Sequence, residues 1–176
     1  VNRDYLAACT NAGFLLDPAF VSEAGCFGPI EGGAYTREHW QFQRDEHGAV
    51  KQDPSLADPH CVFQSLRRHF ARYTWETVSR ICGTPVETLR QLADAFLSTS
   101  TADRTGTIVY AMGATQHTHG TQNVRSYAIL QLLLGNIGVA GGGVNALRGE
   151  SNVQGSTDHG LLFDLLPGYL PAPRAG

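Results

Sequence analysis

The chain has 176 residues, of which 42% are hydrophobic and 16% are charged. A chain of this length can bury a sizeable core, and its composition is that of an ordinary globular protein slightly poor in charge. The formal net charge of −3 comes without long runs of one sign, and no apolar run reaches membrane-spanning length. These features exclude duplex nucleic acid as a partner and a membrane span within the chain.

The four cysteines are far apart, with neither a Cys-x-x-Cys pair nor a histidine at zinc-finger spacing: Cys9, Cys26, Cys61 and Cys82. We therefore expect buried free thiols and no metal site built from this chain alone. The sequence opens on Val1, without an initiator Met or a signal peptide, and stops in an irregular Pro-rich stretch. These two ends predict an internal piece of a longer protein.

The first predicted feature is a long irregular insertion over residues 20–58. This stretch mixes glycine, proline, aromatic and charged residues without a sustained helical or strand period. Four aromatic residues within it favour packing on another surface: Phe27, Tyr35, Trp40 and Phe42.

Three helices are predicted next. Asp58-Pro59 reads as an N-cap followed by a proline at the first helical position, and Thr74 opens a short helix that Gly83 closes. The sequence Thr84-Pro85-Val86-Glu87 reads as a capping box. The buried stripe expected beyond it consists of Val86, Leu89, Leu92, Ala93 and Phe96.

A strand, a loop and a buried helix follow. Residues 107–112 are short, β-branched and aromatic, as in a buried strand that ends at Gly113, and residues 121–134 predict a helix buried on most sides. Eight glycines then fall in residues 135–160, a density that argues against a packed helix or strand and favours a ligand-binding loop. The order strand, loop, helix is one arm of an α/β layer, so the predicted fold class is α/β.

Two groups of residues are candidates for chemistry. Thr115 and Gln116 follow the predicted strand, where ligands bind in open α/β sheets, although an ordinary polar turn would look the same. Arg148 lies in the glycine-rich loop, and its planar fork suits a small carboxylate or phosphate. The alternative for Arg148 is a surface salt bridge to Glu150 or Asp158.

Other sites receive no support from the sequence. The histidines beside these loops, His117, His119 and His159, lack the spacing and third ligand of a known metal site. Phosphate-binding and simple dinucleotide-binding glycine fingerprints are missing, and no serine stands in a nucleophile-elbow setting.

In order along the chain, five motifs closely resemble the large subunit of formate dehydrogenases: Tyr110-Ala111-Met112-Gly113-Ala114-Thr115-Gln116-His117, Gln122-Asn123-Val124-Arg125, Leu132-Leu133-Leu134-Gly135-Asn136-Ile137-Gly138, Gly141-Gly142-Gly143-Val144-Asn145 and Leu147-Arg148-Gly149 to Gly155. The resemblance implies a Rossmann-like layered αβα segment of a pterin-dependent oxidoreductase, interrupted by the long irregular insertion. Residues 1–105 would be the helical and irregular part of the pterin-binding domain. Residues 106–176 would supply cofactor and substrate contacts.

In that family, formate is oxidised to CO₂, or CO₂ reduced, at a molybdenum or tungsten ion held by two pterin-guanine dinucleotides, and electrons leave through iron–sulfur clusters. The resemblance implies that Arg148 holds the formate carboxylate. It also implies seven residues that line the pterin cofactor: Met112, Gly113, Thr115, Gln116, Gly135, Asn136 and Gly149.

At position 150 this chain carries glutamate where some relatives carry histidine or glutamine. A carboxylate there could orient Arg148, relay a proton or compete with the substrate. It also resembles the tungsten-using, exported branch of the family, which implies a periplasmic location, with a cytoplasmic one as the alternative.

The residues that ligate the metal and the 4Fe-4S cluster in the family belong upstream of this stretch, so the piece alone is expected to be inactive. Its implied partners are the remainder of the large subunit, an iron–sulfur electron-transfer subunit and a cytochrome.

Two other functions stay open from the sequence. One is another pterin-dependent oxidoreductase, such as a nitrate reductase, since such enzymes would share the scaffold and the dinucleotide loops. The other is a non-catalytic nucleotide-binding or subunit-contact module. Formate-dependent dye reduction discriminates the first from the proposed function, and metal and pterin content discriminates the second.

Overall fold

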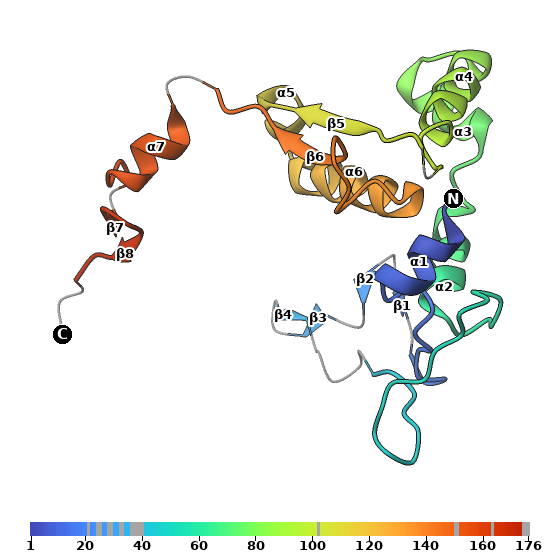
Figure 1. The fold of residues 1–176 in the computed structure, drawn as a ribbon. Helices are drawn as coiled ribbons and strands as arrows, with labels where there is room; N and C mark the ends of the chain where they lie inside the picture. Colours follow the sequence, from blue (N-terminus) through green and yellow to red (C-terminus); the bar gives the residue numbers. More distant parts are fainter. Residues whose placement is uncertain are drawn as a thin grey trace. The chain divides into compact units, whose positions relative to one another are not determined.

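The structure, a computed structural model, describes residues 1–20, 22–23, 26–27, 30–31, 34–35, 41–101, 103–149, 152–162 and 164–173. The chain divides into two compact units. Unit 1 comprises Val1–Thr105 with Leu132–Gly135, and unit 2 comprises Gly106–Gln131 with Asn136–Gly176. Figure 1 shows the elements of both units in colours that follow the sequence.

The core of unit 1 forms around helix α1 (Arg3–Cys9). Asn2 caps this helix, because its side-chain Oδ1 accepts a hydrogen bond of 3.0 Å from the Tyr5 N–H. The buried cluster brings together residues from three separate stretches of sequence, Leu6, Ala12, Leu56, Cys61 and Phe63, with Leu15 and Leu133 packed against it. Unit 1 is thus held by an apolar core that residues 1–20, 53–63 and 132–134 share.

The stretch predicted as an irregular insertion is partly paired. Two antiparallel two-residue ladders, β1 (Ser22–Glu23) with β2 (Cys26–Phe27) and β3 (Ile30–Glu31) with β4 (Ala34–Tyr35), lie within it. Isolated bridges tie Phe14 to Gln52 and Leu16 to Phe42. Of the four aromatic residues predicted to pack, Phe42 sets its ring edge-on to Phe14 at 5.5 Å. The side chains of Phe27, Tyr35 and Trp40 lie outside the described residues.

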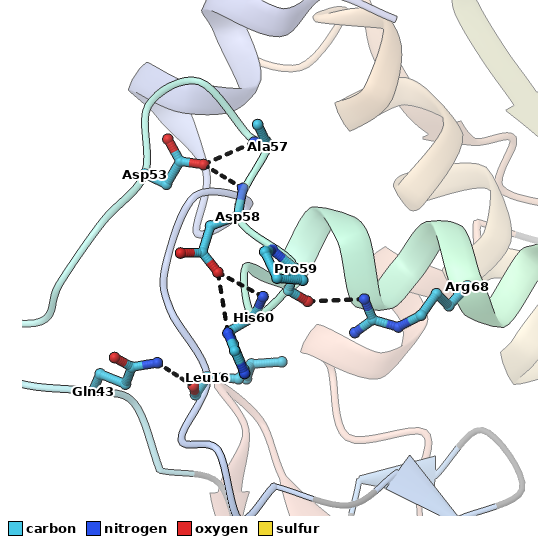
Figure 2. A network of polar contacts seen from close by, with 8 residues as sticks. All are labelled: Leu16, Gln43, Asp53, Ala57, Asp58, Pro59, His60 and Arg68. Atoms are coloured by element: carbon cyan, nitrogen blue, oxygen red, sulfur yellow. Dashed lines mark hydrogen bonds and ion pairs between the residues drawn. The ribbon is translucent and has the colours of Figure 1, made fainter.

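A polar turn precedes the second helix (Figure 2). The Asp53 carboxylate accepts hydrogen bonds of 2.7 Å from the backbone N–H groups of Ala57 and Asp58. Asp58 in turn accepts 2.7 Å from the His60 N–H and lies 3.2 Å from the His60 ring nitrogen. Two carboxylates therefore fix the path of the chain between the insertion and the helix.

Helix α2 (Val62–Phe70) begins three residues later than predicted from Pro59. Its N-cap is Cys61, without a side-chain hydrogen bond, because Asp58 is used in the preceding turn. Only Phe63 of the helix is buried. The Arg68 guanidinium reaches back and donates a 2.8 Å hydrogen bond to the Pro59 carbonyl (Figure 2).

Helix α3 (Trp75–Cys82) confirms both predicted ends. The Thr74 hydroxyl accepts a hydrogen bond from the Thr77 N–H, and Gly83 ends the helix in the left-handed conformation with φ 74°. Helix α4 (Val86–Leu97) packs beside α3, where the Arg90 guanidinium lies 5.0 Å from the centre of the Trp75 ring.

The predicted capping box of α4 is wrong. Its N-cap is Pro85, without a side-chain hydrogen bond, because the Thr84 hydroxyl bonds the Cys82 thiol and lowers its pKa instead. None of the α4 residues is fully buried, and Leu92 is 54% exposed. The prediction of buried thiols holds for Cys61 only, since Cys9 and Cys82 are exposed and the Cys26 side chain is outside the described residues.

Unit 2 contains a β-α-β unit. Strand β5 (Thr107–Tyr110) pairs in parallel with β6 (Gly143–Ala146), and the crossover between them includes α5 (Met112–Thr115) and α6 (Gly120–Leu134) (Figure 1). The prediction of a strand at 107–112 is right for its first four residues. Met112 already belongs to α5, so the strand ends at Tyr110 rather than at Gly113.

The glycine-rich stretch contains regular structure, contrary to prediction. It includes β6 as well as α7 (Val153–Asp158). The hairpin formed by β7 (Leu165–Leu166) and β8 (Leu170–Pro171) follows. Gly143 opens β6 with φ 96°, so here glycine provides the bend into a strand rather than preventing one. No helix among the described residues is both long and apolar enough to span a bilayer.

Candidate functional site at the ends of β5 and β6

Two loops of unit 2 begin side by side because β5 and β6 are parallel and in register. Tyr110 pairs with Ala146 at their carboxyl ends, and the Leu147 N–H donates a 2.7 Å hydrogen bond to the Tyr110 carbonyl. A Cβ placed on Gly149 would lie 3.8 Å from the Met112 methyl carbon. The two loops therefore meet just beyond the strand ends, where ligands bind in open α/β sheets.

The first loop is the short helix α5, which presents its side chains to solvent. Met112 is 56% exposed, and Thr115 and Gln116 are exposed as well. A Cβ on Gly113 would meet no atom within 4 Å, and the Gln116 amide donates to the Met112 sulfur at 3.4 Å. Met112, Gly113, Thr115 and Gln116 thus form one exposed surface of neutral groups.

Two buried amides hold the opposite, amino ends of the same two strands. Gln131 and Asn136 are each 1% exposed. The Gln131 Nε2 donates to the carbonyls of Gly106 at 2.8 Å and Gly143 at 2.7 Å, which precede and open the two strands. The Asn136 Nδ2 donates 3.0 Å to the Gln131 Oε1, and its Oδ1 accepts from the Gly106 N–H at 3.3 Å. The pair therefore connects α6 to both strands.

The predicted cofactor residues Gly135 and Asn136 have other roles in the structure. Asn136 has both ends of its amide bonded within unit 2, so its side chain is not available to a ligand in this conformation. Gly135, which belongs to unit 1, has φ 79°, and a Cβ there would come 2.7 Å from the Asn2 Nδ2. Glycine is needed at this position for the backbone and for the cap of α1.

Arg148 follows β6 by two residues and is exposed. The alternative of a salt bridge between Arg148 and Asp158, both described residues, finds no support, since no such ion pair forms. Glu150 lies outside the described residues, so the hypothesis of an Arg148–Glu150 pair stays a prediction. Within the described part of the loop, the guanidinium is accessible.

Tyr169 is a polar residue to which the sequence analysis gave no role. The Tyr169 hydroxyl hydrogen-bonds the Asp158 carboxylate, and its pKa is raised first by that bond and then by burial. The positive charge of Arg148 has the opposite, smaller effect and lowers the pKa of Tyr169. The local signal in the sequence is the turn-forming dipeptide Pro167-Gly168 that precedes Tyr169.

The histidines beside the first loop do not assemble a metal site. The His117 ring nitrogen lies 2.8 Å from the Gly113 carbonyl, and the rings of His117 and His119 stack at 5.3 Å. Across the described residues, no cluster of three histidine, cysteine, aspartate or glutamate side chains could hold a metal ion. A cofactor at this surface would be held through neutral groups, backbone and Arg148.

Comparison with protein-family models gives no match. Among curated proteins, the chain is 53% identical to formate dehydrogenase subunit alpha of Megalodesulfovibrio gigas and 48% identical to formate dehydrogenase 2 subunit alpha (cytochrome c-553) of Nitratidesulfovibrio vulgaris. It is 49% identical to the nitrate-inducible formate dehydrogenase major subunit of Escherichia coli. Each match covers 98% of this chain and 17% of the relative's length. The chain therefore belongs to the family of formate dehydrogenase large subunits, of which it spans one short stretch.

Proposed function

We propose that the subunit containing this chain interconverts formate and CO₂, with Arg148 as the group that holds the substrate carboxylate. The observation that carries this proposal is that the loops containing Met112 and Gly149 meet beyond the ends of two parallel strands. The exposed Arg148 directly precedes Gly149 in the second loop. The family membership supports it independently. We further propose that the β-α-β unit is part of a Rossmann-like layer of a pterin-dependent oxidoreductase.

The exposed loop fits a pterin-guanine dinucleotide in its chemistry. Such a ligand carries phosphates and many ring heteroatoms, which neutral donors and bare backbone bind well. Thr115 and Gln116 provide the donors, and Gly113 leaves open space for a close approach. Met112 and Gly149 would line the same surface. When bound, the molybdenum or tungsten centre supplies the acceptor for the two electrons that formate gives up.

Arg148 is the residue through which this chain would bind and orient the substrate carboxylate. Its guanidinium is permanently charged and can donate two parallel hydrogen bonds to the two oxygens of formate. Fixing both oxygens leaves the C–H bond as the free end of the substrate and sets its direction. Orientation of this kind lowers the barrier because the entropy of alignment is lost on binding rather than in the reaction.

Glu150 is proposed to tune this group. A carboxylate two residues from the arginine would orient the guanidinium or take up the proton released on oxidation. If Glu150→Gln leaves both turnover and its pH profile unchanged, neither role applies.

The wider assembly is also a proposal. We infer an iron–sulfur subunit and a cytochrome as electron partners, 4Fe-4S clusters held by other parts of the large subunit, and a periplasmic location. One of the relatives carries cytochrome c-553 in its name, which supports the cytochrome for that protein.

The test uses the complete subunit with Arg148→Lys, which keeps the charge but loses the fork. We expect kcat/KM for formate-dependent dye reduction to fall about 100-fold, since a hydrogen bond to a charged group contributes ~1.5–3 kcal/mol. Arg80→Gln, an arginine in the last turn of α3, is the matched control and should stay within about twofold.

Three results would contradict the proposal. Normal formate turnover in Arg148→Lys would remove its substrate role. Nitrate reduction without formate oxidation by the unmodified subunit would identify a different pterin enzyme, and a subunit purified without metal or pterin would favour a non-catalytic module.

A further inference from the structure

Helix α5 is held through its backbone carbonyl groups. The Asn123 Nδ2, in the first turn of α6, donates a 2.9 Å hydrogen bond to the Ala114 carbonyl. The His117 ring nitrogen Nε2 lies 2.8 Å from the Gly113 carbonyl, and because a carbonyl oxygen can only accept, this nitrogen carries the proton. Two side chains from outside α5 thus hold two consecutive carbonyls of the candidate cofactor surface.

Gly120, the first residue of α6, packs against the backbone of Thr115. A Cβ at Gly120 would overlap the Thr115 carbonyl oxygen and lie 2.8 Å from the carbonyl carbon. Gly120 is buried, and its N–H donates a 3.0 Å hydrogen bond to the His117 carbonyl. Only glycine lets α6 begin this close to α5, so the turn between the two helices is short and tightly packed.

The exposure of the α5 residues agrees with these contacts. Ala114, whose carbonyl Asn123 holds, is half-buried, whereas Met112, Gly113 and Thr115 are exposed. A Cβ at Gly113 would meet no atom within 4 Å, so the space beside it stays open. The hydrogen bond from Asn123 therefore holds α5 from the side of the protein and leaves its exposed side to a ligand.

Helix α6 gives Asn123 a fixed base. Asn123, Tyr127 and Gln131 are spaced four residues apart, so they lie on one face of the helix. The Tyr127 ring lies 6.1 Å from the Tyr110 ring of β5, and the Gln131 amide bonds the carbonyls at the amino ends of both strands. The face of α6 that packs on the strand pair thus also reaches α5 through Asn123.

Resting on the proposed function, we propose that Asn123 is a positioning residue that holds α5 in the conformation that binds the pterin cofactor, with His117 as the second residue that holds it. A surface that is ordered before its ligand arrives binds more tightly, because the ligand need not supply the free energy of ordering it. When only a fraction of the subunits has the surface in place, the apparent dissociation constant rises by the inverse of that fraction.

The test measures the order of α5 and the retention of the cofactor in the complete subunit carrying Asn123→Leu. Leucine has nearly the shape of asparagine and a higher helix propensity, so the change removes the donor without weakening α6. Gln122→Met, which removes the neighbouring exposed amide from the same turn, is the matched control. His117→Phe keeps an aromatic ring beside His119 but loses the donor, and so tests the second contact independently.

We expect amide hydrogen exchange of residues 112–116 in the cofactor-free subunit to rise about 3- to 10-fold in both variants, because each loses one hydrogen bond. Exchange in β5 and β6 should change less than about twofold. Release of pterin from the loaded subunit, followed by the fluorescence of the free pterin, should accelerate by about the same 3- to 10-fold. Fully loaded enzyme should keep its KM for formate within about twofold, because neither residue acts on Arg148.

The outcomes separate this inference from the proposed function. Unchanged exchange of residues 112–116 in either variant overturns the inference, and so does faster exchange there without faster release of pterin. Equal loosening of β5 and β6 would assign the two residues a structural role and also overturns it. If Asn123→Leu does not fold, His117→Phe decides, and failure of both to fold counts against the inference. The proposed function fails on a different result, an unmodified subunit that purifies without pterin or metal.

Discussion

Replacing Gln131 by methionine should loosen the parallel pair β5–β6 more than any exposed substitution on the same helix. Methionine keeps the length and nearly the volume of glutamine but can neither donate nor accept comparable hydrogen bonds. The change therefore removes the amide bonds of Gln131 to Gly106, Gly143 and Asn136 and leaves the packing in place.

The cost follows from the three groups that each lose a hydrogen bond, of which the Gly143 carbonyl keeps a 3.3 Å bond from the Thr107 hydroxyl. A buried polar group that loses its hydrogen bond costs about 1–3 kcal/mol. The Asn136 amide is fully buried, and the two glycines are half-buried, so their carbonyls fall at the low end of that range. The sum after partial rescue by water is about 3 kcal/mol, which corresponds to about a 150-fold change in the local opening equilibrium.

Hydrogen exchange in the complete subunit measures this opening at the strands themselves. Peptides covering residues 106–110 and 143–147 should exchange about 150-fold faster in Gln131→Met, with little change in α3 and α4. Gln122→Met, at an exposed position of α6, is the control and should alter exchange by less than ~0.5 kcal/mol. Equal protection of the strands in both variants would show that the buried amides do not hold the pair together.

Three further changes are predicted from unit 1. Gly135→Ala should destabilise unit 1 by about 2 kcal/mol in thermal or denaturant unfolding, because it combines φ 79° with a contact of 2.7 Å to Asn2. Thr74→Ala should cost about 1 kcal/mol, seen as faster amide exchange in the first turn of α3, because the hydroxyl no longer accepts from the Thr77 N–H. Hydrogen bonds, first from the Ser55 side chain, lower the pKa of Asp53 to about 2. The turn that Asp53 holds should therefore be stable at neutral pH and open as the pH falls from about 4 to about 2. Hydrogen exchange of the amides in this turn measures the opening.

Each of these has its own control. Gly138→Ala is the control for Gly135→Ala, because Gly138 has a similar φ of 83° but open space around the added methyl group. The two variants therefore differ in the clash with Asn2. Equal losses of stability would show that this clash does not contribute. Ser98→Ala, at the other end of a neighbouring helix, should leave α3 unchanged, and an equal effect there would mean that capping at Thr74 is not the cause. Asp53→Asn should abolish the acid transition, and its persistence would assign the transition to another group.

Elements with local signals were predicted well from the sequence. Both ends of α3 depend on residues beside them, a hydroxyl at Thr74 and the absence of a Cβ at Gly83, and the structure confirms both. Helix α6 begins one residue from the predicted start, because its long apolar pattern leaves little freedom.

The two wrong helix caps share a different cause, which is competition for the same polar side chain. Asp58 fits an N-cap by sequence but is used by His60, and Thr84 fits a capping box but bonds Cys82. Strand β6 was missed because its partner is 36 positions away and a glycine-rich sequence gives no local strand signal.

The candidate site was predictable from the sequence only in part. Ligands bind beyond the carboxyl ends of parallel strands, which predicts a binding site near Thr115 and Gln116. The structure brings Met112 and Gly149 together at the same strand ends. The buried role of Asn136 depends on its hydrogen bond to Gln131, and the Tyr169 hydroxyl bonds the Asp158 carboxylate. Neither pairing has a local sequence pattern, because both are contacts made by the tertiary fold.

The parallel pairing of β5 and β6 also sets the order in which this part of the chain can form. Strand β5 has no partner among the described residues until β6 exists, and β6 follows only after the whole of α6. Helices form within microseconds from local contacts, whereas a pair closed over such a distance must wait for the intervening chain. During synthesis α6 should therefore fold first. The Gln131 amide on this helix can then bond the Gly106 carbonyl before β5 and, later, the Gly143 carbonyl of β6, and so align the two strands.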